Sequence, residues 1–225
     1  MSDVTLSRVM ESSARSDEMA ATIMLYSLAR LGLEEKAEAL AVCPGMGEYW
    51  RVNDVISTWE RGRGKHNYLL IAGHNQAEKT WADLSVENLQ KPPVGLRRTE
   101  GVHVDMRPEG GNGTNLQARW LLKKAQELDI SSMALFVSPY HLLRAYCTVL
   151  SAFLKAGREI FLIPAPVVVS PDRIIPESGA DAWASVAGEL VRMDKYQVVG
   201  DVATYQELKD YISWFWAHCP LDKRW

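Results

Sequence analysis

The sequence predicts an α/β fold, a three-layer αβα sandwich with a parallel sheet of about five strands, an N-terminal helix and a C-terminal helical extension. Short apolar runs recur with room for a helix between them, at 39–43, 68–72, 102–106, 133–137 and 159–163. Such runs are typical of strands that are buried on both faces, and each parallel connection needs a crossover. With 225 residues, we expect one domain over 1–225, with its core at 39–168 and the extension at 170–225.

Helical segments lie between and around these strands. Ser16, followed by two acids, predicts a helix that ends at Gly32, and the segments 114–128 and 140–157 show helical spacing or a C-terminal glycine. Four prolines within 164–179 predict an irregular crossing segment. Two further helices are expected from about Ala180 to Met193 and from about Thr204 to Cys219.

The composition excludes several classes of protein. The chain is 47% hydrophobic and 24% charged, as in ordinary globular proteins, and its net charge of -3 gives no general attraction to nucleic acid or anionic lipid. Three cysteines without a C-x-x-C pair favour a reducing compartment. Because the sequence has neither a signal-like N-terminus nor a run long enough to cross a membrane, we expect a cytoplasmic protein.

In an open parallel sheet, ligands bind beyond the carboxyl ends of the strands. The loop after the third strand contains Gly110, Gly111 and Gly113, whose backbone amides can approach an anion closely. Thr114 and Gln117 then form either a capping box or contacts with a ligand, and the two roles are compatible.

The loop after the fourth strand reads "SPYHLLR". Ser138 and Pro139 are a natural N-cap and first helical residue, so they need no further role. Arg144 near a helix N-terminus needs an anionic partner, which is either a carboxylate such as Glu109 or Asp105, or a bound ligand. His141 is either a neutral hydrogen-bonding residue or a general acid or base, and in the second role Glu109 is the candidate to poise it.

The first two loops carry weaker signals. Gly45-x-Gly47 resembles the start of a dinucleotide fingerprint, with Trp50 in place of the third glycine. Gly73, His74 and Asn75 follow the second strand, where capping or turn formation is the simplest role. The histidines lack the spacing of metal ligands, so no metal is predicted.

The C-terminal helix predicts a buried stripe of Tyr211, Ile212, Phe215 and Cys219. Its Trp214 and Trp216 lie partly off that stripe. They cover either a neighbouring element or the partner in a homodimer.

The sequence resembles the YdcF-like bacterial family, which includes SanA and ElyC, from about Ala39 to Ala165. "VSPYHLLRA" resembles the family segment V-T-S-x-x-H-x-x-R-A, and "GTNLQA" is similar to N-T-x-E-N-A. Arg51 fits the family's arginine after the first loop, whereas Gln117 stands where the family usually has Asn, as in a divergent member. The resemblance implies a Rossmann-like, HUP-type sheet and links to S-adenosylmethionine and the cell envelope, without a settled reaction.

The leading hypothesis is a Rossmann-like protein that binds a small anionic or nucleotide-like ligand, as a transferase or hydrolase of a phosphorylated or nucleotide substrate. The candidate catalytic residues are His141 and Glu109, and the candidate ligand-binding residues are Gly45, Gly47, Arg51, Gly73, His74, Asn75, Gly110, Gly111, Thr114, Gln117, Ser138 and Arg144. One alternative is a non-catalytic sensor or interaction protein. Another is an S-adenosylmethionine-binding protein, which "AGHN" disfavours because it lacks the acid that binds the ribose.

Overall fold

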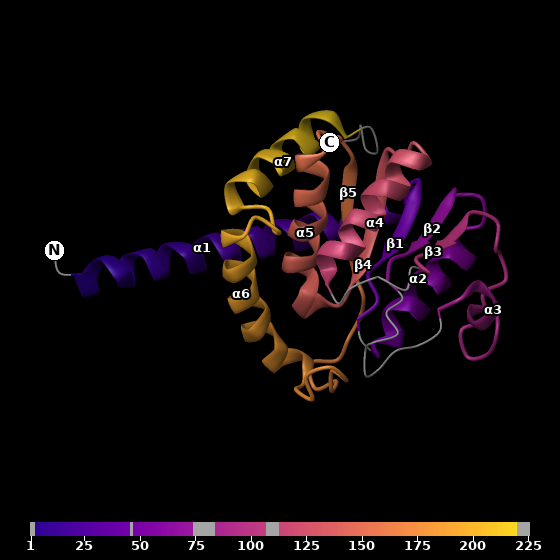
Figure 1. The fold of residues 1–225 in the computed structure, drawn as a ribbon, viewed down its shortest axis with the longest axis horizontal. Coiled ribbons are helices and arrows are strands. Elements are labelled where there is room, and N and C mark those ends of the chain that lie inside the picture. The colour runs from indigo at the N-terminus through magenta and orange to yellow at the C-terminus, as the bar shows by residue number, and fades with distance from the viewer. Residues whose placement is uncertain (1–2, 46, 74–83, 107–112, 220–225) are drawn as a thin grey trace.

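The computed structural model describes residues 3–45, 47–73, 84–106 and 113–219, with side chains from Arg15 onward. Within these residues, five parallel strands form one sheet in the order β3-β2-β1-β4-β5. The strands are β1 (Ala39–Val42), β2 (Tyr68–Ile71), β3 (Val102–Val104), β4 (Ser132–Val137) and β5 (Phe161–Pro166). The predicted five-stranded parallel α/β architecture is therefore confirmed (Figure 1).

Helices cover both faces of the sheet. The main crossover helices are α2 (Tyr49–Arg61), α4 (Thr114–Glu127) and α5 (Leu142–Lys155). Helices α4 and α5 pack side by side on one face (Figure 1). The chain steps from β1 to β2 toward one edge of the sheet and from β4 to β5 toward the other edge. Because both crossovers are right-handed, α2 lies on the opposite face from α5. The order reverses between β1 and β4, so their carboxyl ends flank the topological switch point.

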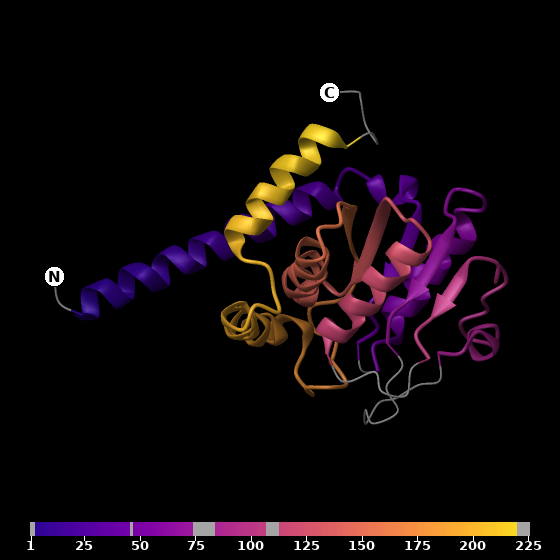
Figure 2. The same cartoon turned by 45° about the horizontal axis from the view of Figure 1, so that its top comes forward.

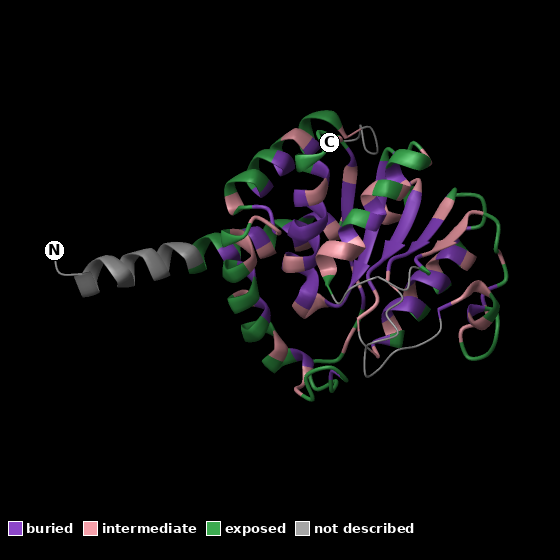
Figure 3. Ribbon diagram, viewed as in Figure 1, coloured by how far each residue is buried: buried purple, intermediate pink, exposed green. Residues whose placement is uncertain are grey.

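The two central strands are buried along their whole length, and the outward surfaces of the helices are exposed (Figure 3). Trp59 of α2 and Phe153 of α5 lie among the largest fully buried side chains, on opposite sides of the sheet. Burial on both faces explains why the strand sequences are almost continuously apolar.

Strand β5 lies two to three residues later than predicted, at Phe161–Pro166 in place of 159–163. It contains Pro164 and Pro166, which have no N–H and normally end a strand. The strand tolerates them because it is at the edge of the sheet and pairs only with β4. Phe161 and Val167 donate to the β4 side, so the even-numbered prolines point their nitrogens away from it.

Helix α1 spans Asp3–Ala29, so the predicted start at Ser16 is wrong. No glycine or proline interrupts 3–29, and a serine inside a helix does not by itself end it. The later part of α1 packs against β5 and α7, while its N-terminal part projects from the body of the molecule (Figure 2). None of the described helices combines the length and apolar character needed to span a bilayer.

The C-terminal extension consists of α6 (Ala182–Val198) and α7 (Tyr205–His218). Helix α6 continues past the predicted end at Met193 because neither glycine nor proline occurs between Met193 and Gly200. Thr204 and Glu207 form a reciprocal capping box at the start of α7. The shorter elements are η1 (Leu33–Lys36), α3 (Val86–Leu89) and η2 (Pro139–His141).

Candidate functional site

A cleft of about 370 Å³ lies over the carboxyl edge of the sheet. One wall comes from the loop after β1, the start of α4 and the η2–α5 segment, and the other comes from α6 and the irregular segment before it. The residues that line it include Pro44, Gly45, Glu48, Arg51, Gly113, Thr114, Gln117, Tyr140, His141, Arg144, Glu177, Gly188, Glu189, Arg192 and Tyr196. The C-terminal extension is therefore part of the site, whereas the sequence placed the site only in the core.

A buried ion pair between Arg51 and Glu48 lies at the switch point between β1 and β4, at the bottom of the cleft. The two side chains are each 3% exposed, and Arg51 Nη2 lies 2.7 Å from Glu48 Oε2. Ser138 Oγ donates to Glu48 Oε2 at 2.7 Å and accepts from Arg51 Nε at 2.8 Å, while Arg51 Nη1 donates to the Cys43 carbonyl at 3.0 Å. This Arg51 cluster joins the loops after β1 and β4, so it fixes the floor of the cleft.

Gly45 is required by this packing. A β-carbon at Gly45 would overlap the carboxylate of Glu48, which lies directly against the glycine backbone. The glycine thus makes room for the buried ion pair, and its role is different from the close approach to a phosphate that Gly45-x-Gly47 suggests. Gly47 lies in a neighbouring shallow hollow with Trp50 and Arg173, outside the cleft.

A second cluster forms around Glu189 of α6. His141 Nδ1 lies 2.7 Å from Glu189 Oε2, and Arg144 donates to the same carboxylate through Nε at 2.6 Å and Nη2 at 3.3 Å. Arg192 Nη1 donates to Glu189 Oε1 at 2.6 Å. Glu189 is therefore the anionic partner of Arg144 that we expected to be Asp105 or Glu109. Asp105 is buried after β3. Glu109 lies outside the described residues.

His141 is held in the neutral form at neutral pH. Burial lowers the pKa of His141 to about 4, and the nearby Arg144 acts in the same direction. Burial alone would raise the pKa of Glu189, but His141 and Arg144 hold it below its usual range, so this carboxyl is ionised. Because an ionised carboxylate only accepts hydrogen bonds, the His141 proton lies on Nδ1 and Nε2 carries a lone pair.

The start of α4 meets this cluster. Gly113 occupies the N-cap position and Thr114 is the first helical residue, so the predicted capping box is wrong. Thr114 Oγ1 lies 3.4 Å from His141 Nε2 and accepts from Arg144 Nη1 at 3.2 Å. Gln117 Nε2 donates to the Pro44 carbonyl at 3.3 Å instead of returning to the cap. Both side chains therefore connect α4 with neighbouring elements.

The charges that line the cleft are balanced among the described residues. Three arginines and three glutamates line it, namely Arg51, Arg144, Arg192, Glu48, Glu177 and Glu189. Helix α4 adds a positive dipole end, because its first residues face the cleft and its first amides have no partner within the helix. The balance suits a ligand of small negative charge better than a polyphosphate.

The structure brings some of the predicted site residues together and leaves others apart. Six of them line the cleft: Gly45, Arg51, Thr114, Gln117, His141 and Arg144. Ser138 lies beneath the cleft with no exposed surface, and Gly73 lies beside the Gln117 side chain. The remaining candidates, His74, Asn75, Glu109, Gly110 and Gly111, lie outside the described residues.

No family model matches this sequence. No curated protein and no solved structure is detectably similar to it. The functional assignment must therefore be argued from the fold and from the geometry of the cleft.

Several lining residues of the cleft were not predicted, and those with charged or hydroxyl groups in its two clusters are Glu48, Tyr140, Glu189 and Arg192. Glu48 directly precedes a helix and stands three residues before Arg51, which is a detectable signal for an i,i+3 ion pair at a helix start. Glu189 and Arg192 have the spacing of an ordinary solvent-exposed pair. Nothing in their local sequence indicates that α6 folds back over the cleft.

Two other kinds of site, a metal centre and a reactive thiol, can be compared with the described residues. No group of three His, Cys, Asp or Glu side chains is placed to hold a metal ion in that part of the chain. Cys43 lies below the cleft, fully buried, and burial raises the pKa of its thiol to about 12. At neutral pH this thiol is protonated and a poor nucleophile.

Proposed function

We propose that this chain is a ligand-binding protein whose cleft, at the switch point of a Rossmann-like sheet, takes a small anionic or nucleotide-like molecule. The observation that carries the proposal is the convergence of Arg144, Arg192 and the N-terminus of α4 on one cleft at the carboxyl edge of the sheet. Arg192 supports a ligand-binding role because its side chain is 47% exposed.

We further propose that His141 accepts a proton from a bound substrate or water in a hydrolysis or transfer reaction. Its Nε2 lone pair lies on the side of Thr114, at the start of α4. A histidine with a pKa of about 4 is a weak base, but an anionic ligand nearby would raise that pKa toward the working range. The ligand itself would thus activate the base.

The YdcF-like resemblance belongs to the same proposal. The segment "VSPYHLLRA" supplies Ser138 to the Arg51 cluster and His141 with Arg144 to the Glu189 cluster. The three polar residues of that segment that carry the resemblance therefore each have a defined partner at the carboxyl edge. A divergent member of such a family would keep this arrangement while binding its own ligand.

A thermal-shift panel tests ligand binding. Inorganic phosphate, nucleotides, sugar phosphates and S-adenosylmethionine are added to the wild type, to Arg192→Ala and to the control Arg119→Ala, an exposed α4 residue outside the cleft lining. A ligand at 100 times its Kd adds about 2.7 kcal/mol, and each kcal/mol moves the midpoint by roughly 2–4 °C in a chain of this size.

We expect one class of anion to shift the wild type and Arg119→Ala, and to shift Arg192→Ala much less. No shift with any anion, or equal shifts in all three proteins, would argue against an anion site in the cleft. A shift with S-adenosylmethionine alone would favour the methyl-donor alternative.

A non-catalytic sensor is the second candidate, and the saturation of Glu189 favours it. This carboxylate already pairs with His141, Arg144 and Arg192, so the cluster is complete without a substrate. Phosphate release from ATP and from p-nitrophenyl phosphate distinguishes the two functions. An enzyme loses turnover in His141→Asn while its thermal shift remains, whereas a sensor shows the shift without turnover in either protein.

A further inference from the structure

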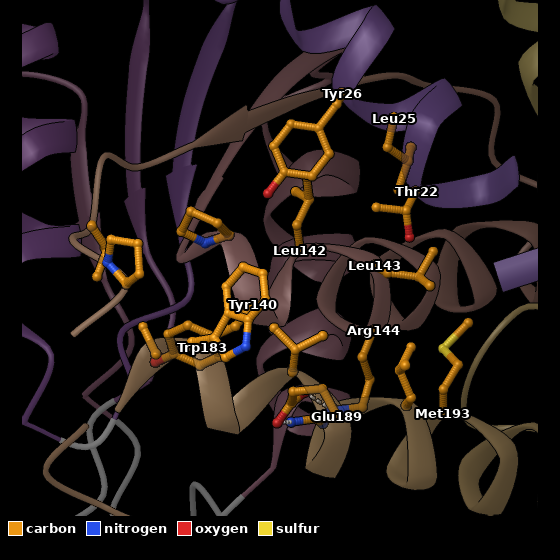
Figure 4. Close-up of a pocket in the computed structure, with 16 residues that line it drawn as sticks. Thr22, Leu25, Tyr26, Tyr140, Leu142, Leu143, Arg144, Trp183, Glu189 and Met193 are labelled. Carbon is orange, nitrogen blue, oxygen red and sulfur yellow. Dashed lines mark hydrogen bonds and ion pairs between the residues drawn. The ribbon is translucent and has the colours of Figure 1, made fainter. Parts of the chain in front are cut away.

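A second pocket, of about 270 Å³, lies behind the cleft, between α1, the start of α5 and α6. In Figure 4, the α1 side chains Leu25 and Tyr26 lie on one side of it and Trp183 and Met193 of α6 on the other. Most of the lining is apolar, including Leu25, Leu142, Leu143, Val186, Leu190 and Met193.

The pocket adjoins the polar cleft. Tyr140, Arg144 and Glu189 line both cavities, so the two are neighbours that share part of their walls. Arg144 presents its guanidinium to the Glu189 cluster, and its side chain is 14% exposed. A molecule that occupied both cavities would place an apolar part against α1 and α6 and a charged part near Arg144 and Arg192.

The shape and lining of the pocket indicate the kind of group that fits it. Its α6 contacts run from Ala182 to Met193, a span of roughly 16 Å at the helical rise of 1.5 Å per residue. Aliphatic side chains dominate the lining, and they offer few partners for the polar edge of a nucleobase, which would be costly to bury unpaired. An elongated hydrocarbon chain makes no such demand.

Exposed apolar side chains continue the pocket onto the surface. Trp183 is 78% exposed and Val186 is 41% exposed, and both belong to the lining. Exposed apolar groups that surround an apolar cavity mark a site where apolar ligands enter.

We propose that this pocket binds the aliphatic chain of an amphiphilic anion. The placement of the anionic group in the adjoining cleft rests on the function proposed above, whereas the binding of the chain rests on the pocket alone. The ligand class is thus a single-chain alkyl or acyl compound with a phosphate or carboxylate at one end.

Titration calorimetry with butyl phosphate and dodecyl phosphate, below the micelle concentration, tests the proposal. Each buried methylene contributes about 0.8 kcal/mol, or roughly fourfold in affinity, so partial burial of the longer chain predicts binding on the order of 100-fold tighter for dodecyl phosphate. Val186→Phe and Thr22→Phe fill the pocket from its two sides and should remove that advantage. Val191→Phe is the matched control, since it is 70% exposed on the same helix and outside the lining.

Equal affinity of the two phosphates for the wild type would overturn the proposal, and so would an unchanged dodecyl advantage in both filling variants. Dodecan-1-ol separates this inference from the function on which it rests. Binding of the alcohol to the wild type and the control, but not to the filling variants, supports the chain site even when neither phosphate responds to Arg192→Ala. A phosphate affinity that Arg192→Ala does not change would count against the anion site only.

Discussion

At the scale of single residues, the protonation of His141 is set by its neighbours. The imidazole is buried, faces two arginines and donates to an ionised glutamate, so the charged form is disfavoured in the folded protein. In the unfolded chain the same histidine titrates near 6.5. This difference couples the folding of the protein to pH.

We expect stability to fall as the pH drops from about 6.5 toward 4, because the unfolded state binds a proton on His141 in this window and the folded state does not. The loss attributable to this residue is about 3 kcal/mol at most, from 1.36 kcal/mol per unit of pKa difference. Urea denaturation of the wild type and His141→Asn across this range measures it. The asparagine keeps a donor for Glu189 but does not titrate, so its stability should fall less steeply.

His66 provides an internal reference for that experiment. Burial lowers its pKa as well, but it lies beside the Ala37 carbonyl at the amino edge of the sheet, outside the cleft lining, and is present in both proteins. Its contribution therefore cancels in the difference between the two pH profiles. Parallel profiles would show that His141 does not carry the pH dependence.

At the scale of elements, the edge strand β5 depends on one side chain of α7. Tyr211 Oη accepts from the Leu162 amide at 2.7 Å and donates to the Ile160 carbonyl at 2.8 Å. Tyr146 Oη donates to the Leu162 carbonyl at 2.7 Å. These hydroxyls satisfy outward backbone groups that a further strand would otherwise bind, so α7, together with Tyr146 of α5, covers the edge of the sheet.

We predict that Tyr211→Phe lowers the free energy of unfolding by about 1–3 kcal/mol, since it leaves a buried amide and a buried carbonyl without that partner. The melting temperature should fall by roughly 2–4 °C per kcal/mol. Tyr49→Phe is the control, because its side chain is 46% exposed. A melting temperature unchanged by Tyr211→Phe would mean that the edge of β5 does not need this hydroxyl.

At the scale of the whole molecule, the C-terminal extension and the core share one ion-pair cluster. Helix α6 contacts the core chiefly at η2 and α5, and Glu189 supplies the charged part of that contact. Two of its partners, His141 and Arg144, are held by the core. The position of α6, and with it one wall of each cavity, depends on this carboxylate.

Replacing Glu189 with Gln should loosen α6 while leaving the sheet intact. The neutral amide keeps the shape of the side chain but leaves the partly buried guanidinium of Arg144 without its anion, a defect that in fully buried pairs typically costs several kcal/mol. Hydrogen–deuterium exchange should show faster exchange in α6 than in wild type and little change in β1 and β4. Asp194→Asn, an exposed acid on the same helix, should behave like wild type, and identical α6 protection in all three proteins would contradict this role of Glu189.

The sequence alone determined the five strands, the alternation with helices and the edge of the sheet that carries the polar loops. These features follow from two things. The patterns of apolar residues can be read in short stretches of the chain, and the geometry of parallel connections is the same in all such sheets. The same reasoning located Arg51, Thr114, His141 and Arg144 in one region, because the carboxyl ends of parallel strands share an edge.

Only the tertiary structure decided which carboxylate serves His141 and Arg144. Glu189 follows Arg144 by 45 residues, on an amphipathic helix whose local sequence is that of an exposed surface. The same holds for the apolar pocket, which exists only where α1 and α6, from opposite ends of the chain, lie across α5. Contacts of this kind depend on how helices dock, and docking is set by packing over the whole surface, which no short stretch of sequence encodes.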